Sequence, residues 1–265
     1  MNRNAVSGAS VTYSDGGAGG TYSTNPVTTN SVGQASTNYT LPTKAQTISM
    51  TASTGSVSVS FSEKAVAGPA ASIAVVSGGG QTGTVGAALP AAIVIGVKDA
   101  LGNGVPGASV TFSDTGAGGT YSTNPVTTNS QGQASTNYTL PTAPKTINMT
   151  ATSGNLNVPF SEKAVAGSPA SMVIASGNQQ SAGTNTPLPS ALVVGVKDQF
   201  GNPVSGAVVT FTDNGAGGTF SSTTATTGTN GNASVTYTTG STPGNITITA
   251  SVSGANSVNF AENVI

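Results

Sequence analysis

One stretch of sequence occurs three times in the chain, and this repetition limits the folds that the chain can adopt. Each copy combines a turn, an alternating apolar pattern and a glycine loop. The copies read RNAVSGASVTYSDGGAGG from Arg3, GNGVPGASVTFSDTGAGG from Gly102 and GNPVSGAVVTFTDNGAGG from Gly201. Their aligned glycines, Gly8, Gly107 and Gly206, are 99 residues apart (107 − 8 and 206 − 107). A period of this length predicts tandem domains rather than a solenoid.

The second repeat shows the alternation of half-buried β-strands. Ile93, Ile95 and Val97 occupy every second position of one run, which is the period of a strand with one buried face. Similar runs lie at 71–77, 108–113, 120–122, 133–140, 146–151 and 156–160. About seven short strands with frequent turn signals and no helical pattern predict a Greek-key β-sandwich. We expect its largest core side chains to be Phe112, Tyr138, Met149 and Phe160.

The period divides the chain into an incomplete repeat one (1–67), repeat two (68–166) and repeat three (167–265). The joints, at 62–70 and 161–170, are short and contain proline, which predicts sandwiches arranged end to end in an extended rod. Asn4 aligns with Asn103, so repeat one has no counterpart of residues 69–102, which hold the first two strands of repeat two. Repeat one alone should be marginally stable, and its open sheet edge invites strand exchange with another chain. Met1 is then interpreted as a fragment boundary or as a start inside a longer gene.

Composition argues against several classes of partner. Charged residues make up only 6% of the chain and its net charge is −1. This charge pattern does not favour binding to nucleic acid or to an anionic membrane. No apolar run approaches the roughly 18 residues of a membrane helix, and the first residues show no export signal. We therefore expect no nucleic-acid partner and no direct membrane insertion.

The chain lacks the usual catalytic and metal-binding side chains. It contains neither cysteine nor histidine, which removes thiolate chemistry, the commonest general base and zinc–thiolate sites. All its carboxylates lie at repeated positions: Asp15, Asp114 and Asp213; Asp99 and Asp198; Glu63, Glu162 and Glu262. Single acids at repeated turns predict backbone hydrogen bonding and roles at turns and joints. We predict no catalytic, cofactor-binding or metal-binding residue, with calcium held at the joints by Glu162 and loop carbonyls as the alternative.

The glycine loops and the aromatic residues beside them each allow two interpretations. The loop at 114–119 lacks the Lys-Ser/Thr pair of a phosphate-binding loop and opens no helix, so its glycines are expected to supply positive φ at a tight corner. Tyr22, Tyr121 and Phe220 share one repeat position. They could form an exposed row that stacks on sugars, or they could pack over the glycine loop at the rim of the core.

Three runs in repeat three carry a family resemblance. VKDQFGNPVSGAVVTF from Val196, TNGNASVTYTT from Thr229 and PGNITITA from Pro243 resemble the bacterial Ig-like domain, group 1, of the invasin and intimin type. With small loop changes the resemblance extends to repeats two and one. It implies tandem immunoglobulin-like Greek-key β-sandwiches that act as non-catalytic stalk repeats of an extracellular, bacterial cell-surface adhesin.

The resemblance also implies partners. These are neighbouring Ig-like repeats in a longer chain and, through the parent protein, a host or carbohydrate ligand. In the alternative function, the repeats themselves form a weak carbohydrate-binding or receptor-binding module, strengthened by multivalency. Without histidine and cysteine, and with its acids isolated at repeated positions, the chain is not expected to be an enzyme.

Overall fold

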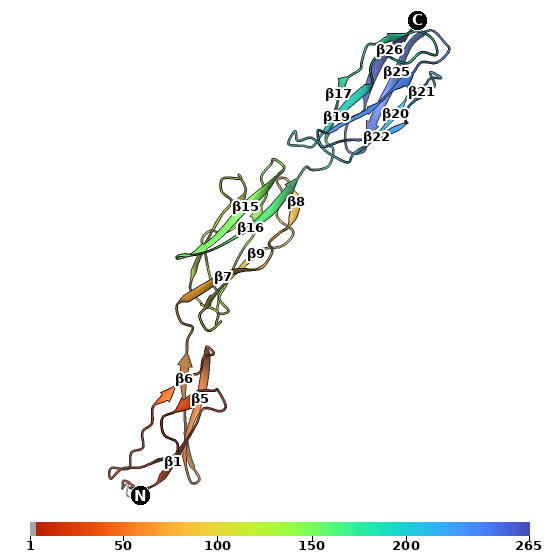
Figure 1. Cartoon of the computed structure of the whole chain (residues 1–265). Coiled ribbons are helices and arrows are strands. Elements are labelled where there is room, and N and C mark those ends of the chain that lie inside the picture. The colour runs from red at the N-terminus through yellow and green to blue at the C-terminus, as the bar shows by residue number, and fades with distance from the viewer. Residues whose placement is uncertain (1–3) are drawn as a thin grey trace.

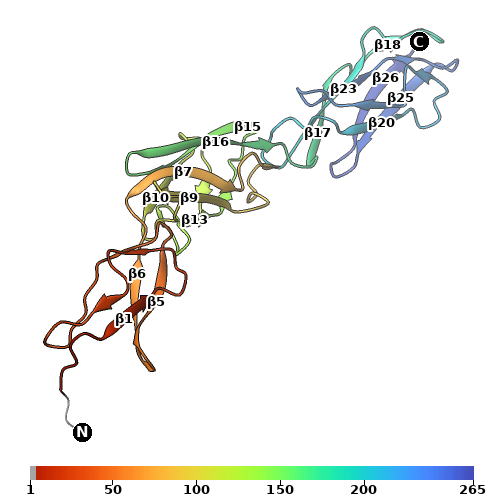
Figure 2. The same cartoon turned by 60° about the horizontal axis from the view of Figure 1, so that its bottom comes forward.

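The computed structural model describes residues 4–265, so Met1 and Arg3 lie outside the described residues. All its elements are β-strands, and none of the described residues forms a helix that could cross a membrane. Three bodies follow one another along a rod, with the two ends of the chain at opposite ends (Figure 1). The rod remains extended when turned by 60° (Figure 2). The predicted all-β, end-to-end arrangement is confirmed.

Repeat two is a two-layer sandwich. Its larger sheet has the strand order β12-β10-β15-β16-β8, its smaller sheet has the order β13-β9-β7, and β11 pairs with β14 as a ribbon. The strands are β7 (Ala70–Ser77), β8 (Thr82–Thr84), β9 (Ile93–Asp99), β10 (Ser109–Ser113), β11 (Thr120–Tyr121), β12 (Val126–Thr127), β13 (Gln133–Thr136), β14 (Tyr138–Thr139), β15 (Lys145–Ser153) and β16 (Leu156–Val165). In Figure 2, β15 and β16 lie over β7 and β9.

The core of repeat two follows the predicted alternation, with two corrections. Ile93, Ile95 and Val97 on β9 are fully buried between the sheets. Phe160, predicted as a large core residue, is only partly buried at the margin of the core. The predicted strand 133–140 is divided into β13 and β14, because β13 pairs with β9 whereas β14 pairs with β11. Alternation indicates which side chains are buried but does not indicate which sheet a strand joins.

Repeat three has the same arrangement. Its sheets have the orders β18-β26-β25-β20-β22 and β17-β19-β23, with the ribbon β21-β24. The strands are β17 (Ser171–Ser176), β18 (Ser181–Ala182), β19 (Leu192–Lys197), β20 (Val208–Thr212), β21 (Thr219–Phe220), β22 (Thr224–Thr226), β23 (Asn232–Val235), β24 (Tyr237–Thr238), β25 (Gly244–Val252) and β26 (Val258–Val264). Here Phe260, the counterpart of Phe160, is fully buried.

Residues 4–67 form only part of this architecture. They comprise the sheet β3-β1-β5-β6 and the ribbon β2-β4, and they hold no counterpart of the sheet β13-β9-β7. The strands are β1 (Ser10–Ser14), β2 (Thr21–Tyr22), β3 (Val27–Thr28), β4 (Tyr39–Thr40), β5 (Gln46–Thr54) and β6 (Val57–Ala65). The fully buried apolar cluster of these residues consists of Ile48, Met50 and Ala65. Residues 69–102 were expected to hold the first two strands of repeat two. They hold three, β7, β8 and β9, because the short strand β8 pairs with β16 of the larger sheet.

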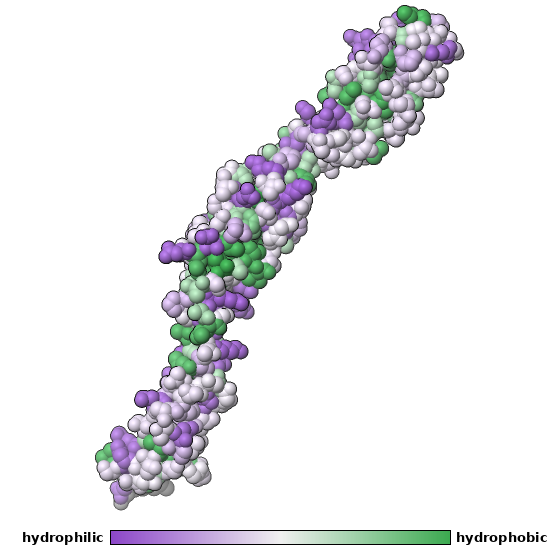
Figure 3. All heavy atoms as spheres, in the orientation of Figure 1, coloured by the Kyte–Doolittle hydropathy of each residue, from purple (hydrophilic) through white to green (hydrophobic). Residues whose placement is uncertain are grey.

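The joints are shorter than the sequence predicts. Residues 62–65 continue β6 and residues 161–165 continue β16, so the chain between strands is reduced to 66–69 and 166–170. The surface of the rod is mostly pale, with hydrophilic residues and several hydrophobic patches scattered over its length (Figure 3). Such short connections place the ends of neighbouring repeats in direct contact.

Candidate functional site

The joint between repeats two and three is organised by one buried carboxylate. Asp198 follows β19, and its Oδ1 accepts hydrogen bonds from the backbone N–H groups of Phe200 and Asn202, both at 2.9 Å. Its Oδ2 accepts a further hydrogen bond from the N–H of Gly167 in the connecting segment, at 3.0 Å. Burial alone would raise the pKa of Asp198, but the hydrogen bonds from Asn202 and Gly167 outweigh it and lower the pKa. One side chain therefore fixes both the turn and the connection.

An amide side chain extends this anchor across the joint. Asn202 Nδ2 donates to Asp198 and also to the backbone carbonyl of Thr142 in repeat two, at 2.8 Å. Asn202 thus joins the carboxylate of one repeat to the backbone of the repeat before it. A lateral displacement of repeat three would break this hydrogen bond.

The joint between repeats one and two uses the same device. Asp99 Oδ2 accepts a hydrogen bond from the N–H of Gly68 at 2.8 Å, and Asn103 Nδ2 donates to the carbonyl of Thr43 at 2.9 Å. The hydrogen bond from the Asn103 side chain is the main cause that lowers the pKa of Asp99 to about 2, against the opposing effect of burial. The predicted turn and joint roles of Asp99 and Asp198 are confirmed.

The two joints differ in their remaining contacts. At the first joint, the N–H of Ala45 donates to Asn103 Oδ1 at 2.9 Å, whereas its counterpart Pro144 has no N–H to donate. At the second joint, the ring of Phe200 lies directly over Gly86 of repeat two, where an added Cβ would be 2.6 Å from Phe200 Cζ. The first joint therefore has an additional hydrogen bond, and the second has an aromatic contact.

The glycine loops have the predicted structural role. Asp114 accepts hydrogen bonds from the N–H groups of Gly116 at 3.1 Å and Gly119 at 3.0 Å, and from the Tyr138 hydroxyl at 2.8 Å. Gly116 has a φ of 78°, in the left-handed region that glycine adopts readily. The same contacts occur around Asp15 and Asp213. The turn role of these three aspartates is confirmed.

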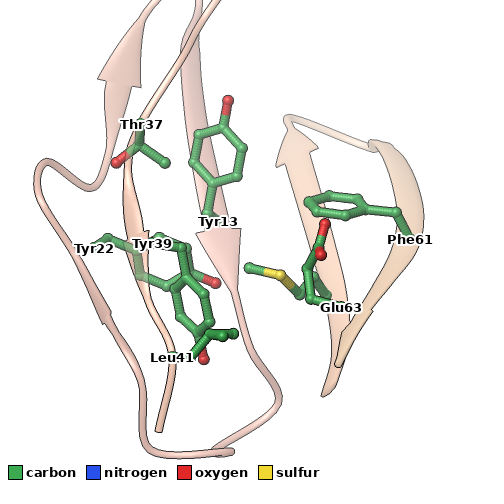
Figure 4. Close-up of a pocket in the computed structure, with 8 residues that line it drawn as sticks. Tyr13, Tyr22, Thr37, Tyr39, Leu41, Phe61 and Glu63 are labelled. Atoms are coloured by element: carbon green, nitrogen blue, oxygen red, sulfur yellow. The ribbon is translucent and has the colours of Figure 1, made fainter. Parts of the chain in front are cut away.

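The aromatic residues beside the loops are part of the core margin. Tyr121 lies between Tyr138 and Phe112, with ring centroids 4.8 and 5.7 Å away. Its hydroxyl is buried without a hydrogen-bond partner, as is that of Tyr22. Phe220 contacts Tyr237 in the same way, at 4.8 Å. The packing interpretation is confirmed, because all three rings are only partly exposed and pack against core aromatic residues, as Figure 4 shows for Tyr22 beside Tyr39.

The glutamates do not lie at turns or joints, which corrects the prediction for this group. Glu162 lies within β16 and Glu262 within β26, and each is only 2% exposed. Glu162 Oε2 accepts a hydrogen bond from the N–H of Gln81, whereas Oε1 has no partner among residues 4–265. Burial raises the pKa of both carboxyls, and hydrogen bonds from backbone N–H groups oppose this only in part. Glu63, without a counterpart of Gln81 beside it, is exposed.

The placement of Glu162 also bears on the calcium alternative. Its side chain is directed into the sandwich of repeat two, so it does not combine with the carbonyls of 166–170. Across residues 4–265, no three acidic, histidine or cysteine side chains form a group that could hold a metal ion.

Asn103 and Asn202 were not predicted as joint residues. The signal was present as an aspartate followed four residues later by an asparagine, at Asp99 and Asp198, with the same spacing 99 residues apart. The contact of Phe200 with Gly86 had no comparable signal, because it joins two repeats that are far apart in sequence.

Comparisons with known proteins agree with this architecture. Residues 170–264 match the family model of the bacterial Ig-like domain (group 1). No curated protein sequence matches significantly. Among solved structures, the chain is similar to the Escherichia coli adhesin FdeC, with a TM-score of 0.70 and 22% identity, over 99% of this chain and 88% of that chain.

Two further structures share the fold. Yersinia pseudotuberculosis InvD matches 99% of this chain and 89% of its own, with 16% identity and a TM-score of 0.61. Invasin, described as a bacterial integrin-binding protein, matches 98% of this chain and 53% of its own, with 18% identity and a TM-score of 0.58. The predicted immunoglobulin-like fold is confirmed.

Proposed function

Since residues 170–264 belong to the bacterial Ig-like domain (group 1) family and the preceding repeats share their sequence, we propose that the chain is a non-catalytic spacer in a bacterial surface adhesin. In this function the repeats hold a distal binding domain of the parent protein away from the cell. The chain is then extracellular, and its immediate partners are further Ig-like repeats of the same polypeptide. The division into 1–67, 68–166 and 167–265 is part of the proposal.

The observation that carries this proposal is the anchored joint. Each connection is only a few residues long, and its backbone is hydrogen-bonded to a carboxylate of the repeat that follows. Asn103 and Asn202 then bind the backbone of the repeat that precedes. A flexible linker does not need these contacts. A spacer that holds neighbouring repeats in a fixed relative position does need them.

The use of the acids also supports a non-catalytic function. Paired-carboxylate catalysis needs two acids in one pocket with different environments. Here each aspartate accepts hydrogen bonds from its own turn, as Asp114 and Asp198 do, and each buried glutamate lies alone between strands. The aspartates are therefore occupied by backbone N–H groups, which supports a non-catalytic function.

Two measurements on the full chain test the proposal. Small-angle scattering should give a particle much longer than it is wide, because the repeats are docked end to end. Binding to a glycan array and to cultured host cells should show no saturable signal. Saturable binding by the chain alone would favour the binding-module function, and a compact particle would contradict the spacer function itself.

A further inference from the structure

An asparagine side chain covers the sheet edge formed by β17 in repeat three. β17 is the edge strand of its sheet, which has the order β17-β19-β23. Asn256, in the connection between β25 and β26, accepts a hydrogen bond from the N–H of Met172 at 3.1 Å and donates one to the carbonyl of Met172 at 3.0 Å. The amide of Asn256 thus lies where the backbone amide of a further strand would lie. Met172 beneath it is only 1% exposed.

The equivalent edge of repeat two is formed by β7, in the sheet of order β13-β9-β7. Ile73 lies opposite Val97 in this sheet, just as Met172 lies opposite Val196 at positions 99 residues later. Because the register is the same, the N–H and C=O groups of Ile73 also point away from the sheet. Ile73 is partly exposed, whereas Met172 is buried.

The hairpin that covers the edge in repeat three is shorter in repeat two. Residues 154–155 connect β15 to β16, whereas residues 253–257 connect β25 to β26. An added Cβ on Gly254 would lie 2.8 Å from the carbonyl oxygen of Pro169, but one on Gly154 would meet no atom within 4 Å. The tip of the shorter hairpin projects from the side of repeat two (Figure 1). It therefore leaves the edge of β7 open.

The sequence of β7 favours pairing with another strand. Residues 70–77, AASIAVVS, contain no charged residue and no proline, which are the residues that commonly protect a sheet edge. Ala74 and Val76 are exposed, Val76 to 51%. Figure 3 shows a hydrophobic patch on repeat two where Figure 1 places β7 and β9. An uncharged, apolar edge of this kind is a template for an incoming strand.

The short length of the regular edge indicates what pairs with it. Register shifts on either side confine the regular pairing of β7 to residues 72–75, and such bulges bend a strand away from its neighbour. A disordered peptide would lose conformational entropy for only a few hydrogen bonds. A second copy of the chain presents the same edge already formed, so it avoids this loss. Since neither edge carries a charge, two copies do not repel each other at this strand.

We propose that β7 is a self-association surface at which two copies of the chain pair edge to edge in antiparallel orientation. Ile73 lies opposite Ile73 of the second copy, about a two-fold axis. The N–H of each donates to the C=O of the other, as Asn256 does with Met172 inside repeat three. Ser72 of each copy then lies opposite Ala74 of the other. This inference does not depend on the spacer function.

Disulfide cross-linking tests the register, because the chain has no cysteine of its own. Positions 72 and 74 of the two copies form a pair without hydrogen bonds, with Cα atoms about 4.5 Å apart, which a disulfide can bridge. A mixture of Ser72→Cys and Ala74→Cys should therefore form a mixed disulfide under mild oxidation. Either variant alone should not, because two copies of one position would be about 8 Å apart. Cross-linking of a single variant as fast as the mixture overturns the proposal.

Sedimentation of the full chain tests the association itself. The average mass should rise with concentration up to about 1 mM, and amide exchange at Ile73 should slow in parallel. Ala74→Lys should weaken association at least about tenfold, because a lysine protects a sheet edge. Val173→Lys, at the equivalent exposed position on the covered edge, should leave association unchanged. Both variants should melt like the parent chain. A chain that stays monomeric throughout, or equal effects of the two lysines, overturns the proposal.

Discussion

Replacing Phe200 with alanine removes the aromatic contact of the second joint and leaves its hydrogen bonds in place. Phe200 is 43% exposed, so somewhat more than half of its surface is buried, and its ring lies over Gly86 of the neighbouring repeat. It is not part of the core cluster of repeat three. The change should therefore loosen the joint without unfolding either repeat.

The expected magnitude follows from the buried area. Full burial of a phenylalanine contributes about 1.5–3 kcal/mol, so the buried part of Phe200 contributes about 1–1.5 kcal/mol to docking. Because 1.4 kcal/mol corresponds to a factor of ten, Phe200→Ala should shift the joint about five- to tenfold towards the undocked state. The hydrogen bond from Asn202 to Thr142, at 2.8 Å, retains about 0.5–1.5 kcal/mol.

Spin-label distance measurements can detect this shift. The chain has no cysteine, so labels can be attached to Ser135→Cys and Ser234→Cys, which are exposed and occupy equivalent positions in repeats two and three. Phe200→Ala should broaden the distance distribution between the labels. The melting temperatures of the repeats should stay unchanged.

Leu101→Ala is the matched control at the first joint. Leu101 occupies the position equivalent to Phe200, but it is 65% exposed and residues 4–67 hold no counterpart of Gly86. With labels at Ser36→Cys and Ser135→Cys, this change should leave the distribution as it is. An unchanged width in Phe200→Ala, or equal broadening in both variants, would refute the reasoning.

The remaining predictions concern single repeats and ions. Tyr138→Phe removes a 2.8 Å hydrogen bond to Asp114 and should lower the free energy of unfolding of repeat two by about 1.5–3 kcal/mol in urea titrations. Tyr121→Phe removes a hydroxyl without a partner and should cost less than about 0.5 kcal/mol; equal losses would contradict this assignment. Burial raises the folded-state pKa of Glu162 above 4.5, so in calorimetry the melting temperature should fall as the pH rises above 4.5, and Glu162→Gln should flatten this decline. The pKa of Asp99 is lowered from 3.8 to about 2, so its stabilising effect is complete above pH 3.8 and is lost as the pH falls through about 2. A chelator should change neither melting nor shape, and a loss of stability that calcium restores would contradict this expectation.

The sequence predicted where most strands lie, but it did not predict which strands pair with one another. Alternation places Ile95 and Val97 inside because a strand with one buried face has a period of two. The same parity runs through Val158, Phe160 and Glu162 on β16, so it already placed this glutamate on the inward face. The assignment to a joint came from its place in the recurring segment 161–170, of which residues 161–165 continue β16.

The contacts between repeats were harder to predict for a different reason. Asp198 could be recognised as a turn residue because two of the N–H groups that donate to it, those of Phe200 and Asn202, lie within four residues of it. The contacts of Asn202 with Thr142 and of Phe200 with Gly86 join positions about 60 and 114 residues apart (202 − 142 and 200 − 86). No local pattern reports such pairs. They depend on how two folded repeats meet.

The location of the joint residues explains how such a rod can be extended and predicts that its stiffness differs between the two joints. Each complete repeat carries the aspartate and asparagine at one end and the accepting carbonyl at the other, so each added repeat brings both halves of a joint. Asn103 and Asn202 both use this arrangement. The aromatic contact of the second joint has no equivalent at the first, where Leu101, 65% exposed, stands at the position of Phe200. The first joint is therefore held by hydrogen bonds, whereas the second also packs an aromatic ring against the neighbouring repeat. From this difference we expect bending to concentrate at residues 66–69.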